Sequence, residues 1–217
     1  MPLPAFLQNK QAAIFDMDGT MVNNMPYHEK AWRIFAKRHG KELSQEDLRW
    51  MFGRKNQEIF PHFFGPLTEK QIETMIFEKE QLYRELFEPE ISEVPGFLDV
   101  LRVLKQHRIL LAIASSAPRE NRILIFKHLP IYDYFDTVIG AEDITHGKPH
   151  PEVFLKAAGK LGINPKNCVV FEDAPNGIAA AKAAGMFVVG ILTTHTKDEL
   201  YKADMLINDF QELFTIA

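Results

Sequence analysis

Cysteine is almost absent from this sequence, whose one cysteine is Cys168. No intrachain disulfide can form, so a disulfide-stapled fold is excluded. The cysteine begins the apolar run Cys168–Phe171, where a buried structural thiol is expected rather than a nucleophile.

Long hydrophobic runs are absent too. The longest aliphatic stretches are much shorter than the roughly 18 residues that span a bilayer. Residues 1–10 lack the basic-then-apolar layout of a secretion signal. The sequence also lacks an excess of positive charge: its formal net charge of -4 argues against a dedicated nucleic-acid binder. We therefore expect a cytoplasmic protein that binds neither nucleic acid nor membrane.

Short apolar runs are present and recur along the chain, with helical patterns between them. Their length and solid apolar character are typical of strands that are covered on both faces. The expected strands are 12–15, 109–114, 137–139, 168–171, 187–191 and, more weakly, 205–207; the expected helices are 96–107, 119–127, 151–161 and 176–184. This alternation predicts an α/β fold with a doubly wound, Rossmann-like parallel sheet.

The segment after the first strand has a different pattern, because no strand signal interrupts it. Residues 27–39 read as a helix, and Ser44 and Thr68 stand where helix N-caps are expected. The helix after Thr68 is predicted to continue to about residue 87. We therefore predict an all-α domain of residues 25–93, inserted into a core made of residues 1–24 and 94–217.

Polar and charged residues follow several of the predicted strands. Ligand sites in open parallel sheets lie beyond the carboxyl ends of the strands. This rule gathers around one crevice the residues Asp16, Asp18, Ser115, Lys148, Glu172 and Asp173. A single aspartate after a strand is more often a turn former or a helix cap, but two acidic pairs after two strands make that explanation inadequate.

The four carboxylates would repel one another strongly without a cation. A set of oxygen ligands suits Mg²⁺ better than a softer metal. Lys148 lies in a loop shaped by glycine and proline, where it can neutralise both a carboxylate and an incoming phosphate. Ser115 offers a hydroxyl and a backbone N–H to a phosphate oxygen.

In order along the chain, these segments resemble the four motifs of the haloacid dehalogenase superfamily. The segments are Asp16–Thr20, Ala114–Ser116, Gly147–Pro149 and Glu172–Asp173. The resemblance covers nearly the whole chain, and the inserted domain resembles the first class of α-helical cap in this superfamily. Residues 26–32, 147–151 and 172–177 further resemble the β-phosphoglucomutase-like group of sugar-phosphate phosphatases and mutases.

The resemblance implies that Asp16 attacks phosphorus and forms an aspartyl-phosphate. Asp18 would act as general acid, protonated for the first step, and then as base. Ser115 would bind the transferring phosphoryl group, and Lys148 would offset charge on that group and on Asp16. The Mg²⁺ ligands would be Asp16, Asp18 through its carbonyl, Asp173, and Glu172 either directly or through a neighbouring ligand.

The resemblance also implies a cap that closes over a small phosphorylated metabolite. Residues 51–57 resemble the cap loop that reads the leaving group. The expected substrate-binding residues are His28, Gly53, Arg54, Lys55, Asn56 and Ser116. Two interpretations of His28 stay open: it couples cap closure to Asp18, or it is a packed helix histidine. A monomer is the state that the resemblance implies.

A β-phosphoglucomutase carries a lysine before the cap-loop glycine and an arginine three residues after it. Phe52 and Asn56 occupy those positions here. We therefore predict a Mg²⁺-dependent phosphatase of a sugar phosphate or similar compound, with a mutase or an inorganic pyrophosphatase as alternatives. A dehalogenase would need neither Asp18 nor the Glu172–Asp173 pair, and a non-catalytic module would have lost at least one of these motif residues.

Overall fold

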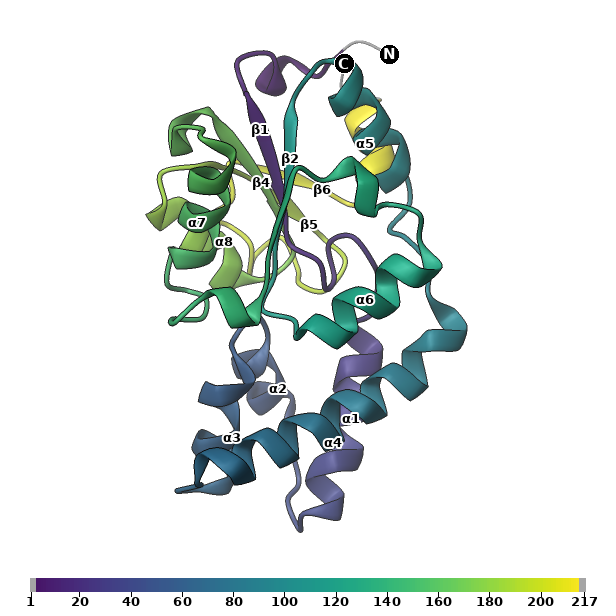
Figure 1. Cartoon of the computed structure of the whole chain (residues 1–217), viewed down its shortest axis with the longest axis vertical. Coiled ribbons are helices and arrows are strands. Elements are labelled where there is room, and N and C mark those ends of the chain that lie inside the picture. Colours follow the sequence, from purple (N-terminus) through teal and green to yellow (C-terminus); the bar gives the residue numbers. More distant parts are fainter. Residues whose placement is uncertain (1–2, 215–217) are drawn as a thin grey trace.

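The computed structural model describes residues 3–214, which form a six-stranded parallel sheet with a helical lobe at one end (Figure 1). The strand order is β3-β2-β1-β4-β5-β6, so the first strand of the chain lies inside the sheet. The strands are β1 Ala12–Phe15, β2 Leu110–Ala114, β3 Thr137–Ile139, β4 Cys168–Glu172, β5 Phe187–Ile191 and β6 Met205–Ile207. The predicted α/β doubly wound fold is confirmed.

Helices cover both faces of the sheet. The side chains of β1 alternate between the faces: Ala13 and Phe15 join one buried cluster, and Ala12 and Ile14 join another. The first cluster lies under α5 and α6, and the second under α7 and α8. These helices are α5 Phe97–Gln106, α6 Arg119–His128, α7 Glu152–Leu161 and α8 Pro175–Ala183. Because both faces are covered, the strand is apolar at every position.

Short 3-10 helices complete the connections. They are η1 Ala5–Leu7, η2 Glu88–Glu90, η3 Tyr132–Tyr134, η4 Ala141–Asp143, η5 Pro165–Asn167 and η6 Phe210–Phe214. Within residues 3–214, no helix combines the length and the apolar character needed to cross a membrane.

The helical lobe lies between β1 and α5 in the sequence and below the sheet in Figure 1. Its helices are α1 Met25–Arg38, α2 Gln45–Met51, α3 Asn56–Phe64 and α4 Glu69–Phe87. Ser44 and Thr68 form capping boxes at the starts of α2 and α4, as the sequence predicts. The lobe has its own apolar cluster, in which Trp32 and Phe35 of α1 pack against Phe60 of α3. We call this lobe the cap; the exact domain boundaries stay a prediction.

One part of the cap differs from the expected cap loop of residues 51–57. Met51 ends α2 and Asn56 already begins α3, so only residues 52–55 connect the two helices. The helix α3 is missed from the sequence because it contains Pro61, which normally ends a helix. Burial of Ile59 and Phe60 in the cap cluster stabilises α3 despite this proline.

Candidate active site

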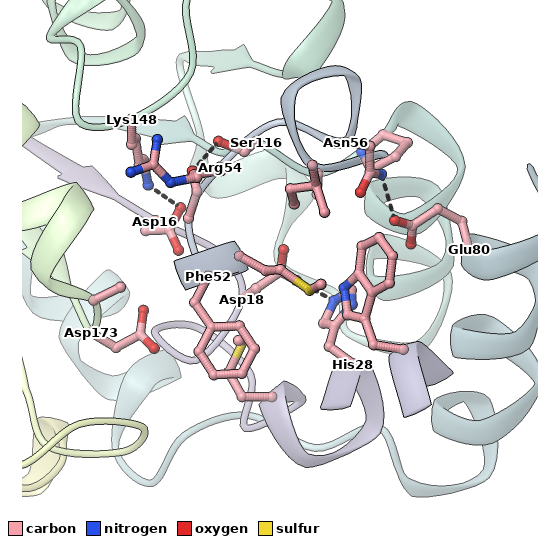
Figure 2. A pocket seen from close by; sticks show the side chains of 18 of the residues that line it. Asp16, Asp18, His28, Phe52, Arg54, Asn56, Glu80, Ser116, Lys148 and Asp173 are labelled. Carbon is pink, nitrogen blue, oxygen red and sulfur yellow. Dashed lines mark hydrogen bonds and ion pairs between the residues drawn. The ribbon is translucent and has the colours of Figure 1, made fainter. Parts of the chain in front are cut away.

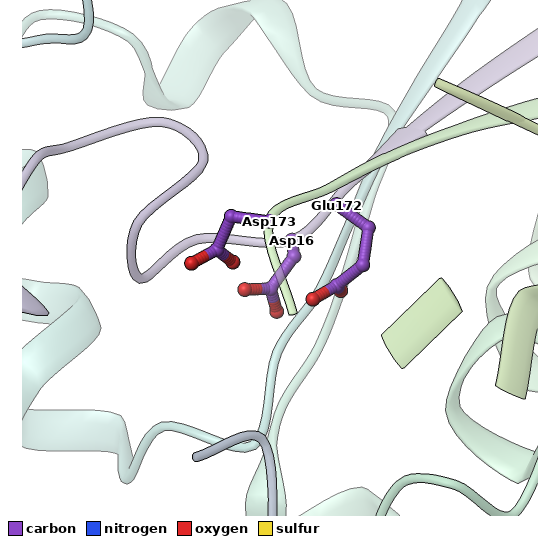
Figure 3. A group of neighbouring side chains, drawn as sticks. All are labelled: Asp16, Glu172 and Asp173. Atoms are coloured by element: carbon purple, nitrogen blue, oxygen red, sulfur yellow. The ribbon is translucent and has the colours of Figure 1, made fainter. Parts of the chain in front are cut away.

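The carboxyl ends of β1 and β4 bring three acidic side chains together. Asp16 follows β1, Glu172 ends β4 and Asp173 comes next. Each offers an oxygen atom that lies within 4.8 Å of those of the other two, and all three side chains are buried (Figure 3). The two strands are direct neighbours, and the Asp16 N–H donates to the Phe171 carbonyl at 3.0 Å. The sheet therefore brings together three of the four acidic side chains that the sequence predicts around one crevice.

Lys148 provides the cation within this cluster. Its ammonium lies 2.6 Å from Asp16 Oδ1 and 2.7 Å from Glu172 Oε2, and its side chain is almost completely buried. Glu172 Oε1 accepts a hydrogen bond from the Ala174 N–H at 3.1 Å. Both oxygens of Glu172 are thus engaged, which makes Asp16 and Asp173 the better candidates for metal ligands.

The cluster still carries more negative than positive charge. Burial, and then the carboxylate of Glu172, raises the pKa of Asp16 well above its ordinary value. The same two causes raise the pKa of Asp173 to about 8. Burial alone would lower the pKa of Lys148, but Asp16 and Glu172 raise it. A further cation would relieve this imbalance.

The cluster fits a bound metal ion on independent grounds. Asp173 Oδ2 is buried and has no hydrogen-bond partner among the described residues. Thr20 Oγ1 donates to the other oxygen of Asp173, at 3.3 Å. An orphaned carboxylate oxygen beside two more carboxylates is a suitable oxygen-only site for a divalent cation. The acidic cluster can therefore hold a metal.

Asp18 lies in different surroundings although it is only two residues from Asp16. Asn24 Nδ2 donates to Asp18 Oδ1 at 2.6 Å, and His28 Nε2 lies 3.7 Å from the same oxygen. Burial would raise the pKa of Asp18, but His28 and Asn24 together outweigh it, so the pKa is lowered. In this structure Asp18 is therefore held ionised, whereas the role that the sequence predicts for the first step needs a protonated Asp18.

His28 is held by Lys79 of α4. Lys79 Nζ lies 3.2 Å from His28 Nδ1, and an ammonium can only donate, so the ring proton is assigned to Nε2. That Nε2 atom is buried without a hydrogen-bond partner among residues 3–214 and faces Asp18. The ring also stacks on Tyr83 with centroids 3.7 Å apart. Both interpretations of His28 thus find support: the side chain is packed, and it faces Asp18.

A pocket lies between the cap and the carboxyl ends of the strands (Figure 2). Its lining includes the predicted site residues Asp16, Asp18, His28, Gly53, Arg54, Asn56, Ser116, Lys148, Glu172 and Asp173. Ser116 Oγ donates to the Gly53 carbonyl at 3.0 Å and so ties the cap connection to the end of β2. Ser115 is fully buried next to the pocket, where its Oγ accepts a hydrogen bond from the Ala117 N–H at 2.9 Å.

Lys55 does not lie where a substrate-binding residue is expected. Its side chain is buried, and Nζ donates to the Ile144 carbonyl at 2.6 Å. The backbone at Lys55 is extended, with ψ 143°, so its side chain and that of Arg54 point in opposite directions. Arg54 lines the pocket and Lys55 does not, which corrects the expectation for Lys55.

Two further pocket residues, Lys79 and Glu80, are missed from the sequence. An adjacent pair of opposite charges in a polar-rich helix normally lies in solvent. Their spacing to Tyr83 and Phe87 is the one signal that places them on the buried face of α4. Both lie in the wall of the pocket, and their side chains form an ion pair of 2.7 Å.

Comparison with known proteins agrees with this geometry. The haloacid dehalogenase-like hydrolase family model matches residues 13–191. The chain is 33% identical over 203 residues to a validoxylamine A 7'-phosphate phosphatase of Streptomyces hygroscopicus subsp. limoneus, covering 94% of this chain and 95% of that protein. It is 32% identical to a phosphorylated carbohydrates phosphatase of Thermotoga maritima, with coverage of 81% and 82%.

A similar solved structure is a β-phosphoglucomutase from Clostridium difficile. The TM-score is 0.84 at 30% sequence identity, covering 94% of this chain and 93% of that one. The family and the enzyme class that the motifs predict, a phosphatase with a mutase as alternative, are confirmed. This chain belongs to the haloacid dehalogenase-like hydrolase family, in its β-phosphoglucomutase-like phosphatase group.

Proposed function

We propose that this chain is a Mg²⁺-dependent phosphatase of small phosphorylated carbohydrates that uses Asp16 as its nucleophile. One observation carries the proposal. Asp16 lines the pocket between the ammonium of Lys148 and the carboxylate of Asp173, while Asp18 turns toward Asn24 and His28. Two carboxylates in one loop therefore have surroundings that suit two different tasks.

In the first step, Asp16 attacks phosphorus and the bond from phosphorus to the leaving oxygen breaks. Lys148 holds one oxygen of Asp16 and offsets negative charge as the phosphoryl group arrives. Mg²⁺ held by Asp16 and Asp173, with the Asp18 carbonyl as a further ligand, would supply charge neutralisation and orient the phosphate. Ser115 and Ser116 directly follow β2, where their hydroxyls can bind phosphoryl oxygens.

Asp18 transfers protons in both steps. A phosphate dianion that enters the pocket disfavours ionised carboxylates nearby, so it raises the pKa of Asp18 and allows Asp18 to carry a proton. Asp18 gives this proton to the leaving oxygen. It then takes a proton from the water that hydrolyses the aspartyl-phosphate.

The substrate class rests on the pocket and on the relatives. The pocket mixes acidic, amide and aromatic side chains, including Glu80, Asn56 and Trp32, which suit a hydroxyl-bearing leaving group. Both relatives are named as phosphatases, one of validoxylamine A 7'-phosphate and the other of phosphorylated carbohydrates, and the second name supports the same class. A cytoplasmic location and a monomeric state stay predictions from the sequence.

The test is phosphate release from a panel of phosphorylated metabolites, pyrophosphate and β-glucose 1-phosphate included, with Mg²⁺ or with a chelator. We expect Mg²⁺-dependent release from sugar or polyol phosphates, and none from Asp16→Asn. Production of glucose 6-phosphate faster than phosphate would favour the mutase instead, and preference for pyrophosphate would favour a pyrophosphatase. Substantial turnover by Asp16→Asn would exclude the covalent mechanism.

A further inference from the structure

The end of the pocket that belongs to the cap is built around Glu80. This side chain is buried and lies in the pocket wall, on the opposite side from Asp16 and Arg54 (Figure 2). Its Oε1 accepts hydrogen bonds from Lys79 Nζ and from Asn56 Nδ2, each at 2.7 Å. Its Oε2 accepts from Asn121 Nδ2 of α6, also at 2.7 Å. Residues of α3, α4 and α6 thus converge on one carboxylate.

The carboxylate stays ionised. Burial alone would raise the pKa of Glu80, but Lys79 and the other donors lower it to about 2. The ammonium of Lys79 is engaged in turn: it contacts Glu80 and His28 and lies 4.8 Å from the centre of the Trp32 ring. The nearby positive charge is therefore committed to Glu80 and is poorly placed to bind a second anion.

Hydrogen-bond acceptors predominate over donors at the cap end of the pocket. A carboxylate only accepts, so Asn56 must direct its N–H group at Glu80, which leaves its Oδ1 atom as a further acceptor. The pocket therefore presents oxygen acceptors here. A hydroxyl group can donate to them, whereas a phosphate dianion has no proton to donate and is repelled by the charge of Glu80.

We propose that Glu80 is a specificity-determining residue, which makes the cap end of the pocket select a hydroxyl group and exclude a second phosphate. This inference rests on the proposed phosphatase function. It explains why this chain has an asparagine at position 56, where a β-phosphoglucomutase carries an arginine. Here the amide belongs to a hydrogen-bond cluster that is organised by a negative charge.

The test compares two substrates that differ only at the far end, mannitol 1-phosphate and mannitol 1,6-bisphosphate. The wild type should favour the monophosphate in kcat/KM by at least about tenfold. Glu80→Gln should reduce this preference by about tenfold, mainly through a lower KM for the bisphosphate. Glu85→Gln, which neutralises an exposed carboxylate of the same helix, should leave the preference unchanged.

The proposal is overturned if the wild type uses both compounds equally well, or if Glu80→Gln and Glu85→Gln change the preference alike. Should Glu80→Gln fail to fold, Asn56→Arg gives the second readout: a cation placed against Glu80 should raise kcat/KM for the bisphosphate, and an unchanged ratio contradicts the proposal. If neither mannitol ester is turned over, their inhibition constants against p-nitrophenyl phosphate give the same comparison. Absence of Mg²⁺-dependent hydrolysis of every ester would instead refute the proposed function.

Discussion

Two positions separate Asp16 from Asp18, yet their carboxylates differ in what surrounds them. Asp16 shares its oxygen with Lys148 and lies against Glu172 and Asp173, whereas Asp18 accepts from a neutral amide. The residue between them, Met17, is completely buried, so the loop is anchored in the core while its two acidic side chains diverge. At the scale of single residues, the different proposed roles of Asp16 and Asp18, as nucleophile and as proton-transfer group, follow from the different groups that contact each carboxylate.

Gly19 follows Asp18 in the same loop and lies directly against the carboxylate of Asp173. Its φ is +76°, and a Cβ atom built there would lie 2.0 Å from Asp173 Oδ2. We expect Gly19→Ala to displace Asp173 and to weaken Mg²⁺ binding and turnover by about tenfold or more, in addition to a backbone cost of about 1–2 kcal/mol. Calorimetric Mg²⁺ titration and steady-state kinetics measure both effects.

Gly162→Ala is the matched control for this change. Gly162 also has a positive φ, of +69°, but a Cβ atom would meet no other atom within 4 Å. The free energy of unfolding of Gly162→Ala should fall by an amount similar to the backbone cost in Gly19→Ala, whereas its Mg²⁺ affinity should stay that of the wild type. Equal Mg²⁺ affinities for the two variants would show that the close contact at Gly19 does not matter.

At the scale of elements, Glu80 joins α4 to α3 within the cap and to α6 of the core. Its pKa is about 2 in the folded protein, against an ordinary value of 4.5. A lowered pKa stabilises the fold above pH 4.5, and this contribution, roughly 3 kcal/mol, is lost as the pH falls toward 2. Urea unfolding from neutral pH to about pH 3 should therefore show the stabilities of wild type and Glu80→Gln converging on acidification. If the difference in the free energy of unfolding between wild type and Glu80→Gln did not change with pH, the lowered pKa of Glu80 would be contradicted.

The elements also show where sequence reasoning succeeds. Strands β1, β2, β4 and β5 are apolar except for Glu172 at the end of β4, because helices cover both faces, and such runs can be read without a structure. Cap residues are harder to place. The direction of Lys55 depends on a backbone angle at the start of α3, and the burial of Glu80 depends on contacts from two other helices. Neither property is local to the sequence.

The connection between α2 and α3 and the first turn of α3 are fixed to the core by several hydrogen bonds. Asn176 Nδ2 donates to the Phe52 carbonyl at 3.0 Å, the Gly147 N–H donates to Glu58 at 3.0 Å, and Lys55 donates to Ile144. Lys55→Met keeps the length of the side chain but leaves the Ile144 carbonyl without this donor. The expected loss in kcat/KM is about tenfold, since a buried hydrogen bond contributes about 1–1.5 kcal/mol to the closed state.

We propose that Lys55 acts on cap closure, so this loss should be the same for every substrate. If Lys55 instead contacted the leaving group, the loss would vary with the size and charge of that group. Comparing p-nitrophenyl phosphate with a sugar phosphate separates the two cases. Lys70→Met, at an exposed position of α4, provides the control and should change neither rate.

At the scale of the whole molecule, the fold brings motifs that are distant in the sequence close together in space. The residues Asp16, Ser115 and Glu172 are far apart in the sequence. Asp16 and Ser115 directly follow β1 and β2, Glu172 ends β4, and β1 pairs with both of the other strands. The rule that sites lie at the carboxyl ends of parallel strands is sufficient to predict this part of the site. The cap has no comparable rule: His28, Gly53, Arg54 and Asn56 are expected only from the family resemblance, and the sequence does not indicate that Lys79 and Glu80 line the pocket.

We expect the same arrangement to make the fold less stable without a bound metal, because three buried carboxylates share one lysine. We expect Asp173→Asn to raise the melting temperature in EDTA by about 3–6 °C, since it removes one of the repelling charges. Wild type should gain stability on addition of Mg²⁺, and the variant should gain little, because a ligand that binds the folded state stabilises it. Asp198→Asn, at an exposed position, should behave as wild type. A lower melting temperature of Asp173→Asn in EDTA would mean that Asp173 stabilises the fold by its own contacts; the expected rise would mean that its charge is kept for binding the cation, at the expense of stability.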